Sequence, residues 1–229
     1  MINFTPRLEI YPERIITNAR HILELCHSHN IQVSCVTKVT CAHPEVVKAL
    51  EFSGADMLAD SRLENLANMK LLGTHLPLML LRIPTPSRVI DTVKLADISL
   101  VSDVSTIHLL SEAAASLSIK HQVILMVDLG DLREGLWPDR VIDALRRIAG
   151  LPGIKVIGLG TNLACYGGVI PSAEKMLQLI HIRDENARAL GLEMPVVCGG
   201  NSANLPMLLR GEMPPAINLL RIGETIMLG

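Results

Sequence analysis

The feature that most constrains the fold is a regular alternation along the chain of short apolar, β-branched runs and longer amphipathic segments. This pattern is typical of βα units, in which parallel strands are covered by helices. We predict strands at Val33–Val39, Met57–Ala59, Pro77–Leu81, Ile98–Val101, Gln122–Val127, Lys155–Leu159, Val196–Cys198 and Asn218–Arg221. We predict helices at Pro12–His29, Pro44–Phe52, Leu63–Leu72, Thr106–Ser116, Pro138–Ala149, Glu174–Ala189 and Ala203–Leu209.

Eight such strands favour an α/β fold of the closed (β/α)8 TIM barrel type, and 229 residues is a usual length for one. The alternative is an open, doubly wound sheet. No G-x-G-x-x-G follows an early strand, so the dinucleotide fingerprint of that sheet is missing. We expect residues 1–229 to form one barrel domain. We also expect Ser61 and Glu64 to form a capping box at the start of the third helix.

Composition narrows the class of protein. The net charge is −2 and there is no large basic block, which argues against a nucleic-acid surface. The longest apolar stretches are too short to span a bilayer, and the N-terminus lacks a signal pattern, so we expect a cytoplasmic enzyme. Five cysteines without a C-x-x-C predict neither a disulfide framework nor a metal site.

Chemistry in a barrel lies where strands run into the following loops. Lys38, in "QVSCVTKVTCAHPE", lies at the C-terminal end of the first predicted strand. A buried ammonium is costly, and burial makes an amine a better nucleophile towards carbonyl groups. We therefore expect Lys38 to form an imine; a lysine that merely extends to solvent is the structural alternative.

The loops after the fifth and sixth predicted strands also carry polar side chains. In "VDLGDLREG", nearby carboxylates can orient the Arg133 guanidinium, although a solvated charged loop would look the same. In "GLGTNLACYGG", Asn162 should point into the barrel mouth, and Cys165 and Tyr166 could reach the same space.

The last two loops suggest a phosphate site. In "CGGNSANLPML", Asn201 and Ser202 lie between two glycines and a helix, where N–H groups and a hydroxyl converge. In "LLRIGETIMLG", Arg221 ends the strand and Gly223 opens the next turn. Pyridoxal 5′-phosphate would use all these groups, with its aldehyde on Lys38, its phosphate near Ser202 and its pyridine nitrogen facing Arg221.

The motifs "VTKV", "VDLGDLREG", "GTNLACYGG", "GGNSAN" and "LRIGETIMLG", in this order, resemble the alanine racemase-type, fold-type III pyridoxal-phosphate enzymes. The ornithine racemase branch is the most similar. The resemblance implies that the Schiff-base lysine, also one of two catalytic bases, is Lys38. It further implies that the cofactor is bound by Lys38, Arg133, Asn162, Asn201, Ser202, Arg221, Gly223 and Glu224.

The resemblance implies a racemase for ornithine or another basic amino acid. Four carboxylates are candidates for binding a side-chain ammonium: Asp128, Asp131, Glu134 and Glu224. An unprotonated pyridine nitrogen facing Arg221 makes a weaker electron sink, which favours racemisation over transamination.

The family's C-terminal β-domain, which supplies the second base across a homodimer, is absent from residues 1–229. Cys165 or Tyr166 is a candidate for that base. The main alternative function is a non-catalytic, single-barrel protein of pyridoxal-phosphate homeostasis. A weaker one is a cofactor-free barrel with Cys165 or Cys41 as nucleophile.

Overall fold

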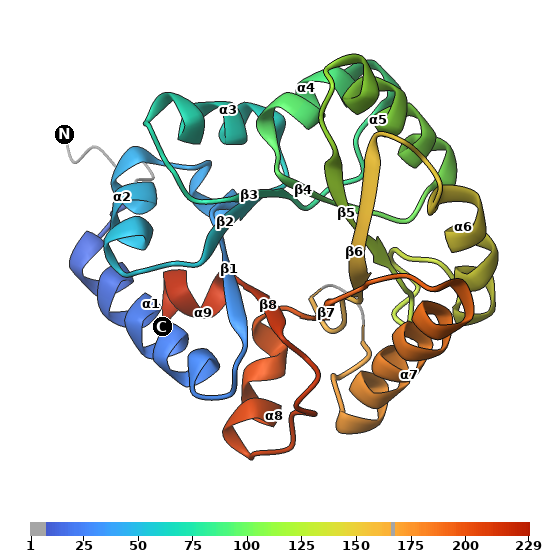
Figure 1. The fold of residues 1–229 in the computed structure, drawn as a ribbon. Helices are drawn as coiled ribbons and strands as arrows, with labels where there is room; N and C mark the ends of the chain where they lie inside the picture. Colours follow the sequence, from blue (N-terminus) through green and yellow to red (C-terminus); the bar gives the residue numbers. More distant parts are fainter. Residues whose placement is uncertain (1–7, 166–167) are drawn as a thin grey trace.

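The strands form one closed parallel barrel (Figure 1). The computed structural model describes residues 8–165 and 168–229. Each strand pairs with the next in sequence, and the last pairs with the first. The strands are β1 Gln32–Val36, β2 Met57–Asp60, β3 Leu78–Leu80, β4 Ile98–Val101, β5 His121–Met126, β6 Ile154–Gly160, β7 Val196–Gly200 and β8 Leu219–Ile222. The closed barrel predicted from the alternating pattern is therefore confirmed, and the open sheet is excluded.

The helices surround the barrel (Figure 1). They are α1 Pro12–His27, α2 Pro44–Phe52, α3 Leu63–Leu71, α4 Val89–Leu95, α5 Val104–Ser116, α6 Val141–Ile148, α7 Ala173–Leu190, α8 Leu205–Leu209 and α9 Glu224–Leu228. Short 3₁₀ turns precede or join them: η1 Lys38–Thr40, η2 Pro86–Arg88, η3 Pro138–Arg140 and η4 Ser202–Asn204. Among the described residues, none of these helices combines the length and the apolar character that a membrane span requires.

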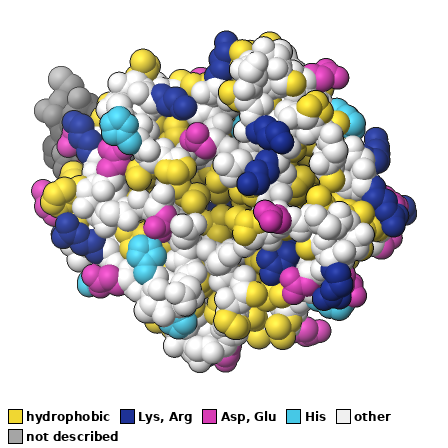
Figure 2. All heavy atoms as spheres, in the orientation of Figure 1, with side chains coloured by type: hydrophobic (Ala, Val, Ile, Leu, Met, Phe, Trp, Pro, Cys, Tyr) yellow, Lys and Arg dark blue, Asp and Glu magenta, His cyan; other side chains and the backbone are white. Residues whose placement is uncertain are grey.

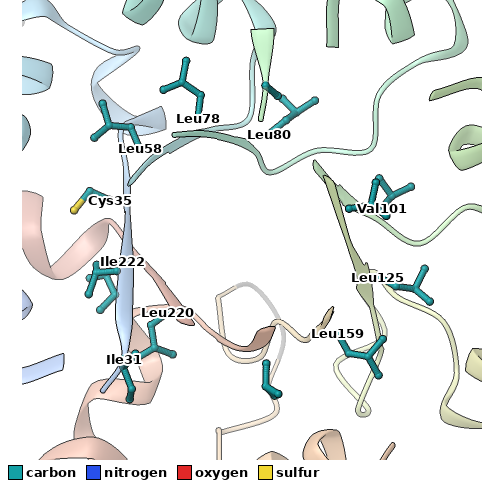
Figure 3. Packing of buried hydrophobic residues seen from close by; sticks show 14 of the residues in the cluster. Ile31, Cys35, Leu58, Leu78, Leu80, Val101, Leu125, Leu159, Leu220 and Ile222 are labelled. Atoms are coloured by element: carbon teal, nitrogen blue, oxygen red, sulfur yellow. The ribbon is translucent and has the colours of Figure 1, made fainter. Parts of the chain in front are cut away.

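Two apolar layers hold the fold together. Leu125 and Leu159 point outward from the ring of strands and pack under the helices (Figure 3). Ile124 and Met126, the neighbours of Leu125 on β5, belong to a second cluster that fills the barrel interior. This alternation follows from the two-residue period of a strand. With only 2% aromatic residues, aliphatic side chains and methionines fill both layers.

Figure 2 shows the distribution of charged and hydrophobic side chains on one face of the molecule. In the face drawn in Figure 2, basic and acidic side chains are interspersed, and hydrophobic side chains lie near its centre. This distribution agrees with the net charge of −2.

One local prediction is wrong, and two short helices were not predicted. α4 was not predicted, because Pro84 and Pro86 precede a helix of only seven residues. α9, after β8, was not predicted as a helix either, since it has only five residues. The capping box of Ser61 and Glu64 does not form, because the N-cap of α3 is Arg62, which has no side-chain cap.

The Asp60 carboxylate at the end of β2 takes over the expected role of Ser61. Its Oδ1 atom accepts hydrogen bonds from Arg62 N at 3.0 Å and from Asn65 Nδ2 at 2.9 Å. A carboxylate near a helix N-terminus is stabilised by the local N–H groups, as a hydroxyl cap would be.

Candidate active site

A cavity of about 630 Å³ lies at the carboxyl ends of the strands. Residues that follow β1, β5, β6, β7 and β8 line it, as expected for a barrel. The residues we predicted from sequence as a binding site all lie on its wall: Lys38, Arg133, Asn162, Asn201, Ser202, Arg221, Gly223 and Glu224. The fold thus brings together side chains that are up to 186 positions apart between Lys38 and Glu224.

Lys38 does not end a strand as predicted, because β1 stops at Val36 and Lys38 begins the η1 turn. The Thr37 hydroxyl donates to Asp60 Oδ2 at 2.8 Å, which fixes the chain just beyond the strand. Cys41 and Ala42 then adopt left-handed backbone conformations, with φ of 51° and 52°. The exposed Lys38 side chain is therefore presented to the cavity from a tight turn.

Arg221 is the buried cation of the site, with 5% of its surface exposed. Its Nη1 donates to Cys198 Sγ at 2.7 Å, and its Nη2 donates to Thr161 O at 3.0 Å and Asn162 Oδ1 at 3.2 Å. No carboxylate of the described residues forms an ion pair with it. The guanidinium is thus held by neutral acceptors while it faces the cavity.

Asn201 links the loops after β6 and β7. Its Nδ2 donates to Asn162 Oδ1 at 3.0 Å and to Leu163 O at 2.8 Å, while its Oδ1 accepts from Ala203 N at 2.8 Å. These bonds use both ends of the amide. Asn201 therefore positions Asn162, which in turn contacts Arg221.

The start of α9 meets the Ser202 hydroxyl. Thr225 N donates to Ser202 Oγ at 3.5 Å, so this hydroxyl contacts the first turn of α9, whose own N-cap residue, Gly223, has no side chain to do so. A Cβ atom on Gly223 would lie 2.9 Å from Val36 Cβ, so only glycine allows this close approach of the loop to β1. Backbone N–H groups and one hydroxyl consequently converge on the cavity wall.

The loop after β5 is held by hydrogen bonds between its own residues. Asp128 Oδ1 accepts hydrogen bonds from Gly130 N at 2.8 Å and Leu132 N at 3.2 Å. At the other end of the loop, Leu136 forms a parallel bridge with Val127. We expected Asp128 to orient Arg133; instead its carboxylate fixes the loop backbone.

Arg133 and Cys165 meet across the cavity wall. The hydrogen bond from Arg133 to Cys165 raises the pKa of the guanidinium, and the charges of Glu134 and Asp131 add to that effect while burial opposes it. Cys165 lies on the cavity and Tyr166, our other candidate for the second base, lies outside the described residues.

Of the four carboxylates that we considered for an ammonium, two line the cavity: Glu134 and Glu224. Asp128 is used by its own loop, and Asp131 Oδ1 accepts a hydrogen bond from Val169 N at 3.3 Å. Asp128 and Asp131 do not belong to the cavity wall. Only Glu134 and Glu224 therefore remain candidates for binding a side-chain ammonium.

Unusual backbone conformations gather around the site. Apart from Cys41 and Ala42, Leu132 and Ala164 are left-handed, with φ of 55° and 54°. They directly precede Arg133 and Cys165. Such conformations cost free energy for residues with a Cβ and tend to occur at functional sites.

Sequence analysis included Asn162 but missed the two other groups that hold Arg221. The Cys198 thiol and the Thr161 carbonyl both accept from its guanidinium. Cys198 was predictable from the two-residue period of a strand. Alternate residues of β7 face the barrel interior, where Cys198 lies. The Thr161 contact is a backbone contact and leaves no residue-type signal.

The family model described as "Alanine racemase, N-terminal domain" matches residues 10–229. The chain belongs to the alanine racemase N-terminal domain family. Two curated relatives match nearly the whole chain, and one solved structure shares its fold.

An ornithine racemase of Acetoanaerobium sticklandii is 41% identical over 225 residues, which are 98% of this chain and 63% of that protein. A lysine racemase of Thermotoga maritima is 38% identical over 224 residues, covering 98% of this chain and 62% of that protein. The chain thus spans about three-fifths of the length of these relatives.

The solved structure of PipY from Synechococcus elongatus with PLP bound shares the barrel. Its TM-score is 0.75 at 17% identity, over 93% of this chain and 99% of that one. At this identity the match supports the fold and no more.

Proposed function

We propose that this chain is the barrel of a pyridoxal-phosphate-dependent amino-acid racemase that acts on ornithine or another basic amino acid. The observation that carries the proposal is the convergence of Lys38, Arg221 and the Ser202–Thr225 corner on one cavity. The identity of 41% to an ornithine racemase over 98% of the chain supports the substrate class.

The donor set of the cavity fits this cofactor. Arg221 is a buried guanidinium whose hydrogen-bond partners are neutral acceptors, so a ring nitrogen that accepts a hydrogen bond is a suitable further partner. The Ser202 hydroxyl and the N–H groups of Gly223 and Glu224 at the start of α9 would offer donors to a phosphate. The Lys38 amine on the same wall is the group that an aldehyde requires.

Each residue then has a distinct role in binding. Lys38 would hold the aldehyde carbon, and Ser202 with the N–H groups of Gly223 and Glu224 would hold the phosphate. Arg221 would face the ring nitrogen, and Arg133 would contact the phenolic oxygen. When bound, the cofactor withdraws electrons from the amino-acid Cα and makes its proton removable.

The protein's own part in the reaction is to move that proton. The Lys38 amine takes the proton from, or returns it to, one face of Cα. Racemisation needs a second acid–base group on the other face. Of our two predicted candidates, Cys165 is the one that the structure describes, and it lines the cavity.

The test is chiral chromatography of single enantiomers of ornithine, lysine and alanine incubated with the full-length protein and cofactor. We expect the L and D enantiomers of ornithine to be interconverted, and likewise those of lysine. Ornithine or lysine should be favoured over alanine. Cofactor binding without interconversion of any of them would contradict the proposal and favour the non-catalytic binding protein.

A further inference from the structure

Neither of the two carboxylates on the cavity wall, Glu134 and Glu224, forms an ion pair with another described residue. Glu134 lines the cavity, and within residues 8–165 and 168–229 it forms no hydrogen bond or ion pair. The hydrogen-bond partner of the neighbouring Arg133 guanidinium is Cys165, which raises the pKa of Arg133. The negative charge of Glu134 adds to that increase. We propose that Glu134 binds the side-chain ammonium of the substrate and thereby selects basic amino acids; this inference rests on the proposed function.

The backbone on both sides of Glu134 is fixed. Upstream, Asp128 binds the N–H groups of Gly130 and Leu132. Downstream, Leu136 N donates to Met126 O at 2.8 Å, and Asp128 N donates to Leu136 O at 2.9 Å. A carboxylate on such a loop loses little conformational entropy when it binds a ligand, so it discriminates better than one on a mobile segment.

The other charged residues of the cavity are less suited than Glu134 to bind the substrate ammonium. Lys38, Arg133 and Arg221 are cations and suit the anionic or electron-rich parts of the ligands. Glu224, the other carboxylate, is exposed at the start of α9, next to the N–H groups that we assign to the phosphate. Glu134 is half-buried and adjoins the Arg133 side of the cavity.

Glu134 also differs from the nearby carboxylates that stabilise the fold. Asp128 and Asp131 accept backbone hydrogen bonds, so each stabilises a loop whether or not a substrate is present. Glu134 has no such partner among the described residues. Its carboxylate is therefore available to bind a ligand.

The test compares ornithine with norvaline, which has the same carbon skeleton but no side-chain ammonium, in full-length wild-type and Glu134→Gln proteins. Removing one charge-assisted hydrogen bond should lower kcat/KM for ornithine by about 10- to 100-fold, mainly through KM. The norvaline value should stay the same or rise. Calorimetric titration should show the same selective loss of ornithine affinity, independently of turnover.

Asp139→Asn is the matched control. Asp139 follows the same loop but is outside the cavity wall, with 74% of its side chain exposed and Arg140 as its ion-pair partner. It should leave the ornithine-to-norvaline ratio unchanged. An equal change for both substrates in Glu134→Gln would overturn the inference, whereas a wild-type protein that racemises nothing would overturn the proposed function instead.

Discussion

At the scale of single residues, the buried charged and polar groups fall into two sets. Arg221 and Asp128 are both buried beside the cavity, where one faces the site and the other fixes a loop. His121 is buried at the first position of β5, at the opposite end of the barrel. Arg221 concerns the site, whereas Asp128 and His121 concern the stability of the scaffold.

His121 should make the protein less stable in acid. Burial lowers the pKa of its imidazole from 6.5 to about 4, against a smaller opposing effect of Asp97. The neutral ring bonds Ser99 Oγ through Nε2 at 2.8 Å. Because the folded-state pKa lies below the unfolded one, this stabilisation is complete above pH 6.5 and is lost as the pH falls towards 4.

Protonation of His121 in acid should lower the free energy of unfolding by at most about 3 kcal/mol. Urea unfolding of wild type and His121→Gln between these pH values isolates the effect, since the carboxylates titrate in both proteins. The variant should show a shallower decline of stability towards acid. Identical pH profiles would show that His121 does not titrate as its burial predicts.

At the scale of elements, the loop after β5 is the decisive unit. Its sequence, "VDLGDLREG", predicted a site because charged residues and glycines follow a buried strand, and two of its residues, Arg133 and Glu134, line the cavity. It did not reveal that Asp128 turns back to the loop while Glu134 faces the cavity. Which of several carboxylates meets which partner depends on φ angles and on the Leu136–Val127 bridge, and neither is encoded by residue type alone.

Gly135 should be essential to this loop. Its φ is +123°, and a Cβ there would overlap the backbone of Val127 and Asp128. Gly135→Ala should therefore lower the free energy of unfolding by about 3 kcal/mol and misplace Arg133 and Glu134. Thermal unfolding and ornithine binding should both show the effect.

Gly150→Ala is the control for that substitution. A Cβ on Gly150 meets nothing within 4 Å, and its φ is not left-handed. Its stability and ornithine affinity should stay close to wild type. If Gly135→Ala behaved in the same way, the loop would not depend on that backbone conformation.

At the scale of the whole molecule, barrel closure creates the site. Pairing of β1 with β8 sets Ser34 opposite Arg221, so loops from both ends of the chain share one wall. Sequence order predicted this closure, since the motifs follow successive strands. It could not predict the Cys198–Arg221 contact or the η1 turn at Lys38, which depend on register and on left-handed residues beyond the strand.

The central claim is that Lys38 is the amine that holds the cofactor in this cavity. The most direct measurement is borohydride reduction of the full-length protein loaded with pyridoxal 5′-phosphate, followed by peptide mapping with mass spectrometry. The account predicts a reduced pyridoxyl group on Lys38 and its loss in Lys38→Ala, whose fold should remain intact by circular dichroism. A label on another lysine, or no label at all, would contradict the claim.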